Sequence, residues 1–176
     1  FLQGEGTVSY DDSGTEFSIF GTVQDITKRY ETEQKIKDLK ELNELIAKIS
    51  ANLIHSPIER IDYEINNSLS LLGNHFSVCR INIIIIEKDI NQLKNIYSWQ
   101  KENIEQDISI ENIFKYDNFK WWISKIFNKE VINLQDIENL PFQASSEKLE
   151  LSKLNVKSIL SVPMIYGDSI IGFINF

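Results

Sequence analysis

Several residue types on which whole classes of protein depend are scarce in this sequence. Its 176 residues include one cysteine, Cys79, two histidines and three prolines. A single cysteine excludes a disulfide framework within the chain and a zinc site built from several cysteines. It is also typical of proteins in a reducing compartment, so we expect a cytoplasmic protein. At Cys79 itself we expect a small core hydrophobe and no reactive thiol.

Long apolar runs and an excess of positive charge are missing as well. The longest apolar run is the four isoleucines at 83–86, far short of the roughly 20 residues that a membrane span needs. No signal-peptide pattern stands at the start. Lysine and arginine number 18 against 26 aspartates and glutamates, and the net charge of −8 argues against binding to nucleic acid.

The patterns that mark catalytic and metal sites are also absent from the sequence. We find no nucleophile with a base, no P-loop, no metal-spaced set of histidines and cysteines, and no kinase or cyclase signature. We therefore expect no catalytic residue and no metal ligand in this chain, and no cofactor is identified. Tyr97, Trp99, Trp121 and Trp122 fit core positions better than a ligand pocket.

A charged segment without glycine or proline occupies residues 27–54. We predict one helix there, about 40 Å long at 1.5 Å per residue. Its apolar residues recur at alternating spacings of three and four, the pattern by which two helices pack side by side. This seam consists of Leu39, Leu42, Ile46, Ile49 and Leu53. It predicts a homodimer formed through the helix.

Residues 1–26 have the pattern of a β-hairpin, with turn composition at 11–14 and alternating apolar residues at 15–24. A Gly-Thr-x-x-Asp-Ile-Thr run follows at 21–27 and leads into the charged helix. This combination resembles the C-terminal end of a PAS domain. The resemblance implies that Asp25 and Thr27 tie the sheet to the exit helix, and both side chains can accept hydrogen bonds at a helix start. On local chemistry alone, an ordinary helix cap explains the same two residues.

After residue 54 the pattern changes to helices mixed with strands. Ser56, Pro57 and Glu59 are typical of a capping box that starts a helix, and Gly73-Asn74 of its end. Asp117 is placed to cap a later helix. The order of elements predicts an α+β fold on an antiparallel sheet flanked by helices. We expect strands at 77–87, 92–100, 131–134, 157–166 and 169–176, and later helices at 117–128 and 146–154.

The second part of the chain also resembles a GAF domain. The resemblance is carried by the tryptophan pair at 121–122, a Val-Ile-Asn-Leu-Gln-Asp-Ile run at 131–137, and a closing pattern of Ser-x-x-x-Val-Pro, Gly-Asp and Ile-Gly-Phe at 158–173. GAF domains usually end with one more helix beside the first, and the sequence does not contain it. The resemblance implies a GAF-like antiparallel sheet, preceded here by a linker helix and a PAS-terminal hairpin.

The ligand motifs of known GAF domains are not matched. Asn128-Lys129-Glu130 is too short to count as the cyclic-nucleotide motif, and Asp136-Ile137-Glu138 stands where bilin-carrying relatives have Asp-Ile-Pro. The resemblance therefore allows a small-molecule ligand without identifying it. Near the start of the strand at 77–87, Arg80 and Asn82 share one face, where we expect the rim of a pocket.

These patterns divide the chain into PAS-terminal strands at 1–27, a coiled-coil linker helix at 28–54, and a GAF domain at 40–176 that overlaps the linker. The resemblances imply the sensory and signal-relay region of a prokaryotic multidomain protein, most often a sensor histidine kinase of a two-component phosphorelay. Control of a diguanylate cyclase by the same region, or a passive dimerisation spacer, are the alternatives. The absent initiator methionine and the apolar last strand indicate a piece of a longer protein.

Overall fold

A computed structural model describes residues 1–10, 14, 16–87, 92–102 and 116–176. The chain divides into two compact units, Phe1–Ile54 and His55–Phe176. Of the predicted turn at 11–14, only Gly14 is among the described residues. The connection at 88–91 and residues 103–115 also lie outside them.

The first unit opens with an antiparallel hairpin of β1 (Leu2–Tyr10) and β2 (Glu16–Asp25). Leu2 pairs with Asp25, so the open end of the hairpin lies where the chain enters the helix. A residue without a side chain is needed at Gly21, because a Cβ there would lie 2.8 Å from the carbonyl oxygen of Glu5. The hairpin confirms the strand pattern that the sequence predicts at this end.

Helix α1 (Thr27–His55) follows as one continuous element of 29 residues. It matches the predicted helix to within one residue at its C-terminal end. Surface ion pairs one turn apart support it, among them Arg29 and Glu33, whose Nε and Oε1 atoms are 2.8 Å apart. None of its residues, all of which the structure describes, is buried.

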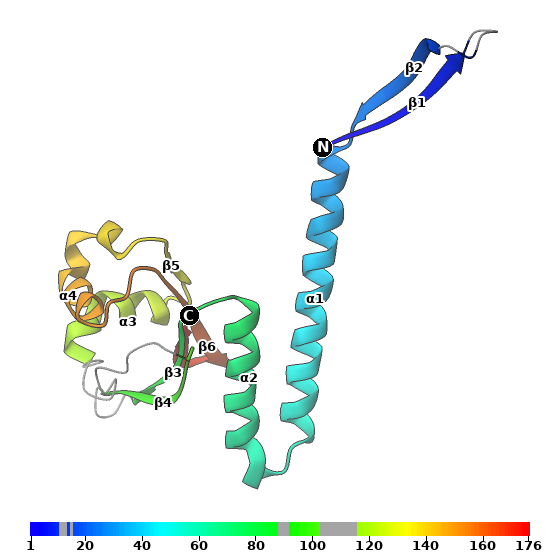
Figure 1. Cartoon of the computed structure of the whole chain (residues 1–176). Coiled ribbons are helices and arrows are strands. Elements are labelled where there is room, and N and C mark those ends of the chain that lie inside the picture. The colour runs from blue at the N-terminus through cyan, green and yellow to red at the C-terminus, as the bar shows by residue number, and fades with distance from the viewer. Residues whose placement is uncertain (11–13, 15, 88–91, 103–115) are drawn as a thin grey trace. The chain divides into compact units, whose positions relative to one another are not determined.

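The second unit is the predicted α+β structure, with one five-stranded antiparallel sheet of order β4-β3-β7-β6-β5. Figure 1 shows α2 on one face of this sheet and α3 and α4 on the other. The strands are β3 (Arg80–Glu87), β4 (Gln92–Gln100), β5 (Ile132–Leu134), β6 (Ile159–Tyr166) and β7 (Ser169–Asn175). The helices are α2 (Ile61–His75), α3 (Lys120–Phe127) and α4 (Ser145–Lys153), with 3-10 turns at Ile58–Arg60, Tyr116–Phe119, Ile137–Asn139 and Phe142–Ala144.

The isoleucine run of β3 supplies both faces of the sheet, as its composition predicts. Successive strand residues point to opposite faces. Ile84 belongs to the main core with Trp122 of α3 and Leu151 of α4. Ile81 is also fully buried but lies outside that cluster, on the face that α2 covers. β3 is therefore a central strand with apolar packing on each side.

The β6–β7 hairpin forms where the sequence predicts it. Gly167 has a φ of +59°, a left-handed conformation that favours glycine in a two-residue turn. Gly172 lies against the neighbouring strand, because a Cβ there would be 2.1 Å from the carbonyl oxygen of Ile84. Both glycines of the Gly-Asp and Ile-Gly-Phe pattern are thus explained by backbone geometry.

Both predicted boundaries of the helix that follows α1 are wrong. No side chain caps the 3-10 turn that begins at Ile58 or α2 itself among the described residues, so Ser56 is not the predicted cap. Gly73 does not end α2, which continues to His75. Gly73 is instead buried against the ring of Trp99, whose Cζ3 atom would lie 2.1 Å from a Cβ at position 73. Close packing between α2 and β4, and not termination, requires glycine there.

Cys79 is exposed, which contradicts its predicted place in the core. Cys79 is the residue immediately before β3, which begins at Arg80. In the part of the chain that the structure describes, no helix is both long and apolar enough to cross a membrane. The same residues contain no cluster of three or more histidine, cysteine or acidic side chains placed to hold a metal ion.

Candidate functional site: a helix junction and a cavity at the strand ends

The residues predicted to tie the hairpin to the helix are in contact. The Asp25 carboxylate accepts a hydrogen bond from the Thr27 backbone N–H at 2.9 Å. Hydrogen bonds from the Thr27 side chain and backbone lower the pKa of Asp25 below its usual value. The Ile26 N–H also donates to the carbonyl oxygen of Phe1 at 2.9 Å. The last residue of β2 is therefore bonded directly to the first residue of α1.

The predicted seam lies along α1 with its apolar side chains open to solvent. Leu39 is 60% exposed and Ile46 is 50% exposed. Leu42, Ile49 and Leu53 are less exposed, but none of the five is buried. An apolar stripe of this kind on a charged helix is the surface that a second helix would cover.

A cavity of about 620 Å³ lies at the end of the sheet where β3 begins and β7 ends; we call it the strand-end cavity. Arg80 and Asn82 both line it, as predicted for a pocket rim. Its size falls in the range of small-molecule sites. The described lining consists of Ser77, Val78, Cys79, Arg80, Asn82, Leu151, Leu154, Asn155, Val156, Lys157, Ser158, Ile159, Asn175 and Phe176.

A row of four polar side chains crosses the sheet, and two of them, Asn82 and Asn175, line this cavity. In the strand register, Ser98 lies opposite Asn82, Asn82 opposite Asn175, and Asn175 opposite Ser161. Asn82 Nδ2 donates to Ser98 Oγ at 2.9 Å, and Trp122 Nε1 donates to Ser161 Oγ at 3.2 Å. Asn175 is 4% exposed, and its Oδ1 atom has no hydrogen-bond partner among the described residues.

The lining side chains give the strand-end cavity a positive character. Arg80 and Lys157 line it, and no described lining residue is an aspartate or glutamate. Arg80 is held in place because its Nη1 donates to the carbonyl oxygen of Leu154 at 3.1 Å. Two basic groups without acidic neighbours stand out in a chain whose net charge is −8.

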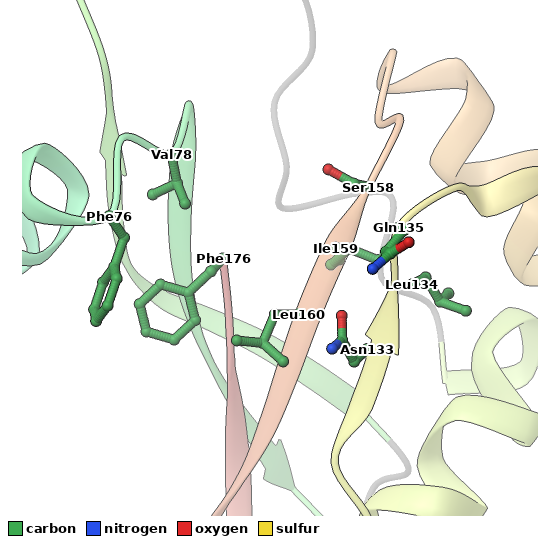
Figure 2. Close-up of a pocket in the computed structure, with 9 residues that line it drawn as sticks. All are labelled: Phe76, Val78, Asn133, Leu134, Gln135, Ser158, Ile159, Leu160 and Phe176. Atoms are coloured by element: carbon green, nitrogen blue, oxygen red, sulfur yellow. The ribbon is translucent and has the colours of Figure 1, made fainter. Parts of the chain in front are cut away.

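A second cavity, of about 520 Å³, adjoins the first and shares part of its lining. Figure 2 shows Phe76 and Phe176 at one side of it, Leu160 in the middle, and Asn133 and Gln135 at the other side. The two phenyl rings are 6.1 Å apart and nearly perpendicular. This cavity contains no charged side chain among its described lining residues and offers mainly apolar contacts.

The aromatic residues considered as alternatives for a pocket lie elsewhere. Trp122 is buried in the core beside Phe119. Trp99 packs on Gly73, and the Tyr97 hydroxyl donates to the Asp62 carboxylate, which raises the pKa of Tyr97. None of the described lining of either cavity includes them.

Glu147 is a buried acid that sequence reasoning missed. Its Oε1 accepts from the backbone N–H of Trp121 at 2.8 Å and of Trp122 at 3.3 Å. The side chain comes from α4 and is 2% exposed, yet it caps α3, replacing the cap predicted at Asp117. Only tertiary packing brings position 147 to a helix start 26 residues earlier, so no local pattern could have found it.

The five-stranded antiparallel sheet with helices on both faces is the GAF-like fold. No protein-family model matches the chain, and no curated protein matches it. Among solved structures, it is similar to the phycocyanobilin-bound GAF domain of a cyanobacterial phytochrome, with 15% identity, a TM-score of 0.61, and coverage of 76% of this chain and 77% of that one. It is also similar to the GAF domain of a phosphoenolpyruvate-protein phosphotransferase from Coxiella burnetii, with 14% identity, a TM-score of 0.51, and coverage of 75% and 74%. Identities this low show the shared fold alone.

Proposed function

We propose that this chain is the sensory and signal-relay region of a multidomain signalling protein, and that this protein is a cytoplasmic two-component sensor histidine kinase. In this proposal residues 1–27 are the closing strands of a PAS domain, 28–54 the linker helix, and 40–176 a GAF domain. The observation that carries it is the direct bonding of Asp25 to the start of α1, a helix that continues unbroken to the boundary of the GAF-like unit.

The proposed mechanism is mechanical. Two copies of α1 pair along the seam, and a signal received by either flanking unit changes the rotation or register of the pair. Such a change requires that the signal favour one state of the pair over the other. Asp25 and Thr27 would transmit the change at the N-terminal end, because the hydrogen bond between them holds the end of β2 close to the start of α1.

Ligand binding by the GAF-like unit is the second part of the proposal. Similar structures contain bilins, for example phycocyanobilin in one and biliverdin in another. For this chain we propose a small-molecule ligand, and the residues that line the strand-end cavity determine its chemical class. A passive spacer would need no such cavity, and the positively charged lining favours the sensory alternative.

Sedimentation of the chain tests the pairing. We expect Leu42→Glu together with Ile49→Glu to give monomers, because two charges would enter the apolar seam. The matched control is Ala47→Glu with Ala51→Glu, which adds the same charge to exposed positions away from the seam. A dimer that survives the seam substitutions, or that the control disrupts equally, would contradict the proposal.

The output is tested in the protein that carries the chain. If the output is a histidine kinase, we expect the protein to phosphorylate one of its histidines with ATP, and we expect the signal to change the rate of that reaction. Formation of cyclic diguanylate from GTP would replace this assignment with the cyclase. If the protein shows neither activity but still dimerises, the passive dimerisation spacer is the remaining interpretation.

A further inference from the structure

Arg80 brings a positive charge to the strand-end cavity that no described residue neutralises. Its side chain is partly buried, and none of the ion pairs between described residues includes it. The bond from its Nη1 to the carbonyl oxygen of Leu154, at 3.1 Å, holds the guanidinium in place and uses one of its five N–H donors. A partly buried cation loses part of its hydration, so an anion bound beside it is favourable.

Lys157 adds a second positive charge from the other side of β7. It lies two residues before β6, whereas Arg80 begins β3, and β7 separates these two strands in the sheet. Lys157 is exposed, lines the same cavity, and forms no ion pair with a described residue. Its contribution is the smaller of the two, because an exposed charge stays hydrated. Arg80 is therefore the group that would hold an anion.

The second cavity extends this space with an apolar surface. The residues that line both cavities are Val78, Ser158, Ile159 and Phe176. The described lining of the second cavity carries no charge, and Phe76, Phe176 and Leu160 follow one another along it (Figure 2). Phe76 is 47% exposed, so an apolar group placed there would remove hydrocarbon surface from water. A cationic space and an apolar space therefore adjoin.

We propose that the two cavities together bind a carboxylate with a medium-length hydrocarbon tail. The carboxylate lies against Arg80, and the tail passes the four shared residues into the second cavity, where it contacts Phe76 and Leu160. A neutral apolar compound would leave Arg80 without a counter-ion, and a small anion would leave the apolar surface in contact with water. The inference rests on the proposed sensory function and names the chemical class of its ligand.

Three probes separate the contributions of the head and the tail. Octanoate carries both, 1-octanol has the same tail with a neutral head, and hexanoate has the same head with two fewer methylene groups. Titration by ligand-observed NMR at neutral pH, on the protein that carries this chain, gives the Kd of each.

Octanoate should bind most tightly of the three. We expect about a tenfold advantage over 1-octanol from the charged hydrogen bonds to Arg80. We expect about a tenfold advantage over hexanoate, because each buried methylene group contributes roughly three- to fourfold. An apolar surface without a cation would instead prefer the alcohol, because a carboxylate costs more to remove from water.

Substitutions of Arg80 assign the preference for the head. Arg80→Gln is expected to weaken octanoate by about tenfold while the Kd of 1-octanol stays unchanged, and Arg80→Lys to restore part of the loss. The matched control is Arg60→Gln, which removes an exposed guanidinium outside both described linings and should change neither Kd.

A substitution in the second cavity assigns the preference for the tail. Leu160→Asn places a polar group among the apolar contacts and should bring octanoate and hexanoate to within about threefold of each other. Ile165→Asn, on the same strand but outside both described linings, should keep the difference between the two acids.

The inference is overturned if octanoate shows no binding up to about 5 mM, a limit that corresponds to very weak affinity. It is equally overturned if the unsubstituted protein binds 1-octanol as tightly as octanoate, a result that does not depend on whether a variant folds. If either result is found while α1 still pairs, the ligand class is wrong and the relay proposal stands. If octanoate binds as expected but α1 does not pair, the ligand class stands and the relay proposal is wrong.

Discussion

Glu147 should be the acid whose removal most weakens the GAF-like unit. Its side chain is 2% exposed, and one carboxylate oxygen accepts from two backbone N–H groups at the start of α3. Glu147→Ala removes that acceptor and leaves the partly buried N–H of Trp121 and the buried N–H of Trp122 without it. The cap also joins α4 to α3, so its loss acts on two helices of the core.

The magnitude follows from the two bonds. A hydrogen bond to a charged group contributes about 1.5–3 kcal/mol, and the bond at 2.8 Å should lie in that range. The bond at 3.3 Å is weaker, and a negative charge at a helix N-terminus adds about 0.3–1 kcal/mol. We expect Glu147→Ala to lower the free energy of unfolding by roughly 3–4 kcal/mol. Glu147→Gln keeps an acceptor of similar shape and should cost about 1 kcal/mol.

Urea unfolding followed by tryptophan fluorescence measures this loss. All three tryptophans, Trp99, Trp121 and Trp122, belong to the second unit, so the signal reports its unfolding and not that of the hairpin or α1. Glu138→Ala is the control, since its carboxylate is 69% exposed and forms only a surface pair with Lys148, worth less than about 1 kcal/mol. A loss below about 1 kcal/mol for Glu147→Ala would refute the capping role.

Three further predictions test local geometry. Gly73→Ala should cost about 1–3 kcal/mol in the same unfolding assay, because the new Cβ would collide with the Trp99 ring. Ser56→Ala should cost less than about 0.5 kcal/mol, whereas a true cap would lose about 1 kcal/mol. Thr27→Val should raise the pKa of Asp25 toward its usual value, as read by NMR titration of the carboxylate. Because the folded pKa is lowered, the stability from this contact is present above the usual aspartate pKa of about 4 and is lost as the pH falls through the folded value.

Sequence patterns predicted the elements whose signals are local. The Ile-rich strand, the two-residue turn at Gly167 and the long charged helix all follow from residue spacing and turn chemistry. Arg80 and Asn82 were also predicted as a pocket rim, because alternation along one strand suffices to place them on one face.

The failures share a physical cause, which is dependence on distant packing. Gly73 has the composition of a helix end, but the ring of Trp99 on another element decides its role. Asp117 has the chemistry of a cap, but the Glu147 carboxylate is the group that accepts from the free N–H groups at the start of α3. Asn175 joins the cavity only through its register with β3, a pairing across more than 90 residues that no local pattern reveals.

The proposed relay depends on two α1 helices pairing along the seam, and cysteine cross-linking tests that pairing directly. In a Cys79→Ser background, Leu42→Cys places a thiol on the seam, whereas Ala51→Cys places one on the opposite side of the helix. A disulfide needs Cα atoms about 4.4–6.8 Å apart, a separation that paired parallel helices provide only at the seam. We predict a covalent dimer for Leu42→Cys and monomers for Ala51→Cys under mild oxidation. No dimer at position 42, or equal dimer at both positions, would contradict the pairing.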